Sequence, residues 1–258
     1  MDNNMINQDV AEFSKRIEHL LQVNPNKRIL RFEYKGQIFW LKQPEKLRGI
    51  WNLLKPNPQK AFVRETVILQ RFMQMGAPVP KLVLSGEHFF VLEDGGLTIA
   101  DWLEDPQLSE ARKMQILRDA VQALIDLHHC GFVHGRPALR DMTWKAGKVF
   151  FIDFESHSRS QNLLRKQVCD GLIFIHSLGR SKVLSDKQMR AAVDYYAQHC
   201  EAKIWQKIID FIAKWRWLYR FLLMFKPIAK TDLIAIYRVF EHILPDLRKT
   251  LSRGSRHS

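Results

Sequence analysis

Hydrophobic positions near the start of the chain follow first a helical period and then a strand period. Apolar residues recur every three or four positions between residues 9 and 23, which predicts an amphipathic helix. Residues 30–34 and 37–42 alternate apolar and polar positions on either side of a Lys-Gly pair, and this pattern predicts a β-hairpin. The second strand of the hairpin ends in Lys42.

A further helix and two more strands are predicted after the hairpin. Helical spacing over residues 59–75 stops at Gly76, and two prolines follow within four residues. Glu65 lies on this helix, on the same face as the apolar stripe. Short apolar runs at 81–85 and 89–92 predict two strands.

Beyond about residue 95 the pattern becomes helical, with one interruption. Ser109 is a suitable N-cap for a helix that ends at Gly131. Residues 142–144 and 148–152 predict a small hairpin. The remaining pattern predicts four helices, over residues 163–178, 185–199, 201–225 and 231–250.

The element order predicts an α+β protein with a strand-rich first part and a helical second part. We expect a helical extension over residues 1–26, a strand-rich lobe over 27–94 and a helical lobe over 95–258.

Composition narrows the class of protein. The chain has 258 residues, of which 46% are hydrophobic. This hydrophobic content excludes a protein that is disordered over its whole length. Three widely spaced cysteines exclude a disulfide scaffold and favour a reducing compartment. No apolar run approaches the roughly 18 residues that a membrane span needs. Because the first residues do not resemble a signal peptide, we expect a cytoplasmic protein.

The net charge of +13 is concentrated toward the end of the chain. Residues 202–258 contain 12 Lys or Arg against 4 Asp or Glu, a surplus of 8. Residues 204–228 interleave aromatic and basic side chains, a composition found both in core helices with exposed cations and in helices on anionic membranes. We favour the core helix and expect Trp205, Phe211, Trp215 and Leu222 to be buried. Weak contact with the inner face of a membrane remains a hypothesis, and nucleic-acid binding is disfavoured because no recognised motif accompanies the charge.

One carboxylate in the middle of the chain needs a partner. Asp153 directly follows the apolar run 149–152, and an aspartate at the end of a buried strand must be paired or bound to a metal. Asp141 lies seven residues after His134.

The order of these residues resembles that of protein kinases. The kinase pattern H-R-D-L-x-x-x-N is followed by a strand that ends in D-F-G. Here His134 opens the first motif, Asp141 stands where the pattern has Asn, and Asp153-Phe154-Glu155 stands where it has D-F-G. Lys42 ends the strand that would carry the kinase lysine, and Glu65 lies on the following helix.

Further details are similar to the bacterial kinase-like proteins of the lipopolysaccharide kinase group. These details are Leu127-His128-His129-Cys130-Gly131, a histidine-glycine loop start, and an acidic residue after the Asp-Phe pair. The resemblance spans roughly residues 28–180. The catalytic loop departs from the pattern, because Arg136 occupies the position of the catalytic aspartate, and no glycine-rich loop precedes Lys42.

The resemblance implies a two-lobed protein-kinase-like fold that binds ATP and Mg²⁺. It implies that Lys42 contacts the nucleotide phosphates, that Glu65 holds Lys42 by an ion pair, and that Asp153 and Asp141 bind the metal. The alternatives are a surface lysine and a surface carboxylate for the first pair and a hydrogen-bonded turn for Asp153. For Asp141 the alternative is a salt bridge to Arg136 or Arg140.

Arg136 cannot serve as a general base, because its pKa exceeds about 12. It could grip a phosphate in bidentate fashion or brace the loop against an acidic neighbour. Asp141 could then accept the proton if the loop rearranges. An aspartate corresponding to Asp170 holds the catalytic loop in kinases, and we expect the same here, with His128 and His134 as hydrogen-bonded core histidines.

The leading functional hypothesis is an ATP- and Mg²⁺-dependent phosphotransferase. The acceptor would be a lipopolysaccharide sugar or another small molecule, a glycolipid or a protein. The alternative hypothesis is an inactive pseudokinase that senses a nucleotide or binds a partner.

Overall fold

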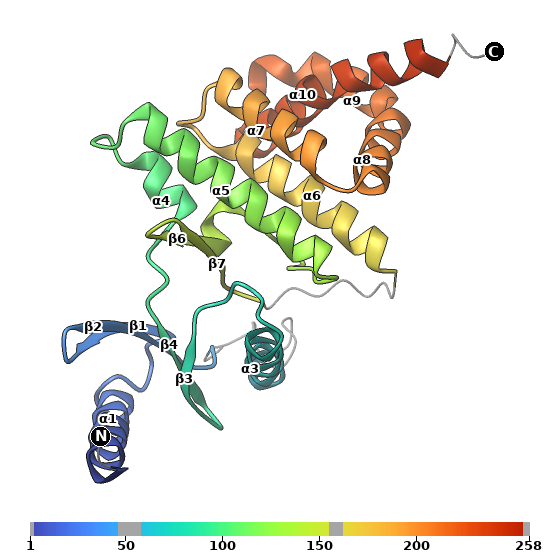
Figure 1. Ribbon diagram of the computed structural model, residues 1–258. Coiled ribbons are helices and arrows are strands. Elements are labelled where there is room, and N and C mark those ends of the chain that lie inside the picture. Colours follow the sequence, from blue (N-terminus) through green and yellow to red (C-terminus); the bar gives the residue numbers. More distant parts are fainter. Residues whose placement is uncertain (1–2, 46–57, 155–161, 255–258) are drawn as a thin grey trace. The chain divides into compact units, whose positions relative to one another are not determined.

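The computed structural model describes residues 3–45, 58–154 and 162–254. They form an α+β protein with two compact units, Met1–Asp94 and Gly95–Ser258 (Figure 1). Among the described helices, none combines the length and the apolar composition that crossing a membrane requires.

The N-terminal unit contains a four-stranded antiparallel sheet and two helices. The strand order is β1-β2-β4-β3. The elements are α1 (Asn3–Val23), β1 (Ile29–Tyr34), β2 (Gln37–Lys42), α3 (Pro58–Gln74), β3 (Leu82–Gly86) and β4 (Phe89–Glu93).

Each face of this sheet packs against a different helix. Phe39 and Leu41 of β2 point to one face and form a buried cluster with Ile17 and Leu20 of α1. Successive side chains of a strand alternate between faces, so Lys42 points to the other face. There the Phe90 ring of β4 stacks on Phe62 of α3, with ring centroids 5.1 Å apart.

The hairpin between β1 and β2 depends on a turn with positive φ angles. Lys35 has a φ of 49° and Gly36 a φ of 75°. Two positive φ angles define the type I′ turn, whose twist matches that of the flanking strands. The turn fixes the register that pairs Tyr34 with Gln37 and Ile29 with Lys42.

The C-terminal unit consists of a small antiparallel sheet, ordered β5-β6-β7, and a set of helices (Figure 1). The first elements are β5 (Leu97–Thr98), α4 (Ile99–Glu104), α5 (Glu110–His129), the 3-10 turn η1 (Leu139–Asp141), β6 (Met142–Lys145) and β7 (Lys148–Phe151). The later elements are α6 (Leu163–Arg180), α7 (Asp186–His199), α8 (Ala202–Lys214), α9 (Arg216–Leu222), the 3-10 helix η2 (Leu223–Ile228) and α10 (Thr231–Gly254).

Helix α6 runs through the centre of this unit and approaches its neighbours closely. Six of its residues from Asp170 to Gly179 are buried. A Cβ atom added at Gly171 would lie 2.7 Å from the Tyr196 hydroxyl, and one added at Gly179 would lie 3.0 Å from the Ala235 carbonyl oxygen. Glycine at these two positions therefore permits the close packing of α6 against α7 and α10.

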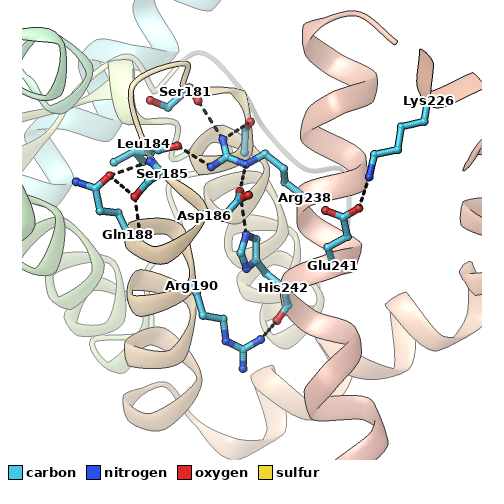
Figure 2. Close-up of polar contacts among 11 residues, drawn as sticks. Ser181, Leu184, Ser185, Asp186, Gln188, Arg190, Lys226, Arg238, Glu241 and His242 are labelled. Atoms are coloured by element: carbon cyan, nitrogen blue, oxygen red, sulfur yellow. Dashed lines mark hydrogen bonds and ion pairs between the residues drawn. The ribbon is translucent and has the colours of Figure 1, made fainter. Parts of the chain in front are cut away.

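Arg238 of α10 fastens the end of α6 to the start of α7. Its guanidinium donates to the carbonyl oxygens of Gly179, Ser181 and Leu184 and to the Asp186 carboxylate (Figure 2). The last carbonyls of a helix have no partner within the helix, so a half-buried cation that donates to them stabilises the helix end.

Residues 201–225 do not form the single helix that their periodicity predicts. The helix breaks at Trp215, which has φ −93° and ψ 7° and ends α8 as it begins α9. Contacts with α10 hold the new direction, because Tyr219 stacks on Phe240 with ring centroids 4.8 Å apart. The chain then tightens into η2, where Pro227 lacks the N–H of an α-helical hydrogen bond.

The burial predicted for this segment is wrong at Phe211, which is 44% exposed. Trp205, Trp215 and Leu222 are only half-buried. The buried stripe of α8 consists instead of Ile204, Ile208, Ile209 and Ile212. The isoleucines supply enough apolar surface to fill the space against α6 and α10, so the aromatic side chains remain at the edge.

Candidate functional site

Lys42 and Glu65 form a buried ion pair in the N-terminal unit. Lys42 Nζ donates to Glu65 Oε1 at 2.6 Å, and the two side chains are 12% and 3% exposed. The antiparallel register sets Lys42 opposite Phe90, and the Lys42 ammonium lies 5.8 Å from the centre of that ring. Because Phe62 of α3 stacks on the same ring, the helix presents Glu65 to the end of β2. The structure therefore places these two predicted residues together.

Asp170 fixes the loop that begins at His134. Its carboxylate accepts hydrogen bonds from the backbone N–H groups of His134, at 2.7 Å, and of Gly135, at 2.9 Å. The His128 ring approaches the same carboxylate at 3.3 Å. All the atoms involved belong to buried or half-buried residues. The prediction that Asp170 holds this loop is confirmed, as is the prediction that both histidines are hydrogen-bonded in the core.

The ring of His134 joins this loop to the end of β7. Its Nε2 donates to the carbonyl oxygen of Ile152 at 2.9 Å, while its Nδ1 accepts from the backbone N–H of Arg136 at 3.2 Å. One donor and one acceptor describe a neutral imidazole. Burial agrees with this state, because it lowers the pKa of His134, with Asp170 opposing the shift.

Arg136 bridges the two candidate metal ligands. Its Nη2 donates to Asp153 Oδ2 at 3.0 Å, and its Nε lies 3.3 Å from Asp141 Oδ2. Arg140 approaches the other Asp141 oxygen at 3.8 Å. The salt bridges considered for Asp141 are thus both present, and Arg136 braces the loop against acidic neighbours. Glu155 lies outside the described residues.

The Asp141 carboxylate is the more deeply buried of the two, with 6% of its side chain exposed against 28% for Asp153. Burial raises the pKa of Asp141, and the neighbouring Asp153 charge adds to the rise, while Arg136 and Arg140 oppose it. A carboxyl group with a raised pKa is a better proton acceptor near neutral pH.

Asp153 holds a strained backbone conformation. Its φ is 65°, in the left-handed region that residues other than glycine enter at a cost. Such strain persists where the surrounding structure holds it, and it concentrates at functional sites. Here the hydrogen bond from Ile152 N–H to the Asp141 carbonyl and the ion pair with Arg136 hold the turn.

Asp141 and Asp153 would be suitable ligands for a magnesium ion. Two carboxylates converge on one guanidinium, and one or two carboxylates with substrate phosphates are the usual protein ligands of Mg²⁺. Arg136 contributes a positive charge to the same place. A metal there would require the guanidinium to turn toward another anion, and a nucleotide phosphate would be such an anion.

Two residues that hold the loop were missed from sequence. Gln167 donates to the His128 carbonyl at the end of α5, and the Ser177 hydroxyl accepts from the Leu139 N–H of η1. Both lie on α6 at helical spacing from Asp170. Polar residues recurring along the otherwise apolar stripe of a buried helix were the signal that would have identified them.

Comparison with known proteins identifies the chain's relatives. No family model matches it. An uncharacterized protein of Haemophilus influenzae is 49% identical over 240 residues, which cover 93% of this chain and 98% of that protein. The chain belongs to the family of this protein.

More distant matches are to kinases and kinase-like proteins. The serine/threonine-protein kinase RIO3 of Homo sapiens is 25% identical over 176 residues, or 62% of this chain and 33% of that kinase. The KEOPS complex subunit Bud32 of Pyrococcus abyssi is 28% identical over 99 residues, or 36% of this chain and 42% of that subunit. The chain thus spans less than half the length of either protein. With the strand-rich first unit and the helical second unit, these matches establish a protein-kinase-like fold.

Proposed function

We propose that this protein is an ATP- and Mg²⁺-dependent phosphotransferase that acts on an alcohol group. The observation that carries the proposal is the buried ion pair between Lys42 and Glu65, at 2.6 Å. In protein kinases a strand lysine held by a helix glutamate must be in place for the transfer to occur. Burying a charged pair is costly, and a role in holding a polyanion explains why a lysine is kept there.

The second unit supplies the other residues that phosphoryl transfer needs. In the proposal Asp153 and Asp141 hold Mg²⁺ on the nucleotide phosphates. The metal, when bound, neutralises charge on the phosphate oxygens. Arg136 then leaves the two carboxylates and grips a phosphate oxygen pair, because a guanidinium matches phosphate geometry in bidentate fashion.

The proposed reaction moves the terminal phosphoryl group from ATP to a hydroxyl group. The bond between the terminal phosphorus and the ADP oxygen breaks, and a bond from phosphorus to the acceptor oxygen forms. In the proposal the loop rearranges so that Asp141 leaves the metal to Asp153 and takes the proton of the acceptor hydroxyl; burial raises the pKa of Asp141. A sugar of lipopolysaccharide is the first acceptor to test, followed by other small molecules, glycolipids and proteins.

A second candidate function is a nucleotide-sensing or partner-binding module without catalysis. Contacts of Arg136 favour it, since one guanidinium neutralises both candidate metal ligands at 3.0 and 3.3 Å. An arginine at this position also replaces the aspartate that accepts the proton in protein kinases. Losing such a base costs about 10²- to 10⁴-fold in rate.

Calorimetric titration with ATP, with and without Mg²⁺, tests nucleotide binding. Lys42→Met and Glu65→Gln should each weaken ATP binding, and Asp153→Asn should remove the part of the affinity that depends on Mg²⁺. The matched control is Asp210→Asn, a carboxylate on α8 with an exposed lysine partner, which should change nothing. Equal ATP affinity in wild type, Lys42→Met and Asp153→Asn would exclude a kinase-like nucleotide site.

Turnover with labelled ATP separates the two candidate functions. An enzyme should transfer phosphate to an acceptor at a rate that falls by about 10²-fold or more in Asp153→Asn. Arg136→Gln gives the sharper distinction. If Arg136 grips a phosphate, Arg136→Gln should lose the turnover that wild type has. If Arg136 only neutralises the two carboxylates, Arg136→Gln should bind Mg²⁺ more tightly, and neither wild type nor the variant should turn over ATP.

A further inference from the structure

The segment from Phe211 to Lys230 exposes large apolar side chains to solvent. Seven of them are at least 37% exposed, and we call this set the interfacial face. Its members are Phe211 (44%), Trp217 (64%), Phe221 (52%), Leu223 (37%), Met224 (66%), Phe225 (39%) and Ile228 (75%). Exposed apolar residues are ordinary when scattered, but contiguous ones mark an interaction surface.

The fold does not need these side chains. Helix α8 packs through its four isoleucines, and α9 packs through Tyr219, which stacks on Phe240. The Tyr237 hydroxyl donates to the carbonyl of Leu222 and ties the end of α9 to α10. With these contacts made, the remaining aromatic and aliphatic groups of α9 and η2 are exposed to solvent.

An apolar groove shares Phe211 with the interfacial face. It has a volume of about 450 Å³ and lies between α6, α8, α9 and α10. Phe211, Trp215 and Leu222 line it on one side and Val239 and Phe240 on another. His176 also lines it, and burial lowers the pKa of this histidine, which favours the neutral ring. The apolar surface is therefore wider than the exposed side chains alone.

The segment that carries the interfacial face is basic. Between Phe211 and Lys230 the chain has five Lys or Arg and no Asp or Glu. Lys226 is paired with Glu241 of α10 at 2.8 Å (Figure 2). Within the described part of the chain, Lys214, Arg216, Arg220 and Lys230 make no ion pair. Their charge is available to an anionic partner.

We propose that the interfacial face docks on an anionic phospholipid membrane, with α9 and η2 lying in the plane of the headgroups. An interfacial helix requires aromatic and aliphatic residues on one side and Lys or Arg beside them. Tryptophan favours this depth because its ring is amphipathic. Four cations that make no ion pair among the described residues complement a surface of phosphate groups. The proposal does not depend on nucleotide binding or catalysis.

The expected strength follows from the charges. One Lys or Arg near an anionic surface contributes about 1 kcal/mol, which corresponds to about fivefold in partitioning. Lys214→Gln with Arg220→Gln should therefore weaken binding about 30-fold at low salt. Replacing Trp217, Phe221 and Ile228 by serine should weaken it more than about 100-fold, since each buried apolar side chain contributes more than one cation.

Co-flotation with vesicles tests the proposal. Wild-type protein should float with phosphatidylcholine vesicles that contain phosphatidylglycerol and stay behind with phosphatidylcholine alone. Matched controls are on α1, where Val10 is 58% exposed. Val10→Ser and Lys15→Gln with Arg16→Gln should float like wild type. Because all the substituted apolar residues are exposed, circular dichroism should show the same helix content in each variant.

Several outcomes would overturn the proposal. One is absence of flotation at low salt, and another is equal flotation with neutral vesicles. A third is unchanged flotation of the serine variant, which would locate the contact elsewhere. Light scattering adds a fourth: a wild-type dimer that becomes monomeric in the serine variant, with no vesicle binding in either, would identify the face as an interface between two copies. Binding that survives high salt in wild type but not in the serine variant supports insertion of the aromatic residues.

Discussion

Replacing Asp170 by asparagine should destabilise the protein far more than the loss of one surface charge. The Asp170 carboxylate accepts from two backbone N–H groups, of His134 and Gly135, at 2.7 and 2.9 Å. Asparagine keeps one acceptor oxygen and turns an NH₂ group toward the other N–H. An unsatisfied buried donor costs about 1–3 kcal/mol, and the remaining bond loses its charge assistance. We expect a loss of about 3 kcal/mol, or a fall in Tm of about 6–12 °C.

Thermal unfolding followed by circular dichroism measures this change. The matched variant is Asp210→Asn, whose carboxylate lies 3.4 Å from the exposed Lys207 ammonium. An exposed pair contributes at most about 1 kcal/mol, so its Tm should fall by less than about 4 °C. On this scale, about 2–4 °C in Tm corresponds to 1 kcal/mol. If the Tm values of Asp170→Asn and Asp210→Asn differed by less than about 2 °C, the loop would not depend on the Asp170 carboxylate, and the reasoning would be refuted.

Three further predictions concern stability and thiol chemistry. Arg238→Ala should lower Tm by about 4–12 °C, because it removes charge-assisted hydrogen bonds to three carbonyl oxygens, which together contribute about 2–3 kcal/mol to stability. A fall in Tm of less than about 2 °C in thermal unfolding would contradict this prediction. Burial lowers the pKa of His134 in the folded protein below its ordinary value of 6.5. The unfolded chain therefore binds more protons, and the stability of the protein should fall as pH drops through 6.5. The Tm difference between about pH 7.5 and about pH 5.5 should be smaller in His134→Gln than in wild type, and an identical difference would contradict the assignment. Burial raises the pKa of Cys200 to about 12, whereas Cys130 and Cys169 are exposed, so mass spectrometry after brief alkylation should find the label on the latter two first.

The local pattern of the sequence was sufficient for most elements. Helices α3, α5, α6, α7 and α10 and both hairpins lie within a few residues of their predicted ranges, because spacing, caps and turn residues act over a few positions. Helix α1 begins at Asn3, six residues before its predicted start at residue 9. The short elements β5 and α4, over Leu97–Thr98 and Ile99–Glu104, were missed. They are too short for a period to show, and the capping box between Thr98 and Asp101 was their only signal.

The sequence by itself determined which chemical groups the site has, and the tertiary structure decided which of them meet. Lys42, Glu65, Asp141 and Asp153 could be named from their order along the chain. That Arg136 pairs with Asp153, seventeen positions away, follows only from the way η1 and β7 pack. The same holds for the break at Trp215 and the outward side chains of α9, because periodicity records which residues can be buried, whereas packing against α6 and α10 selects those that are.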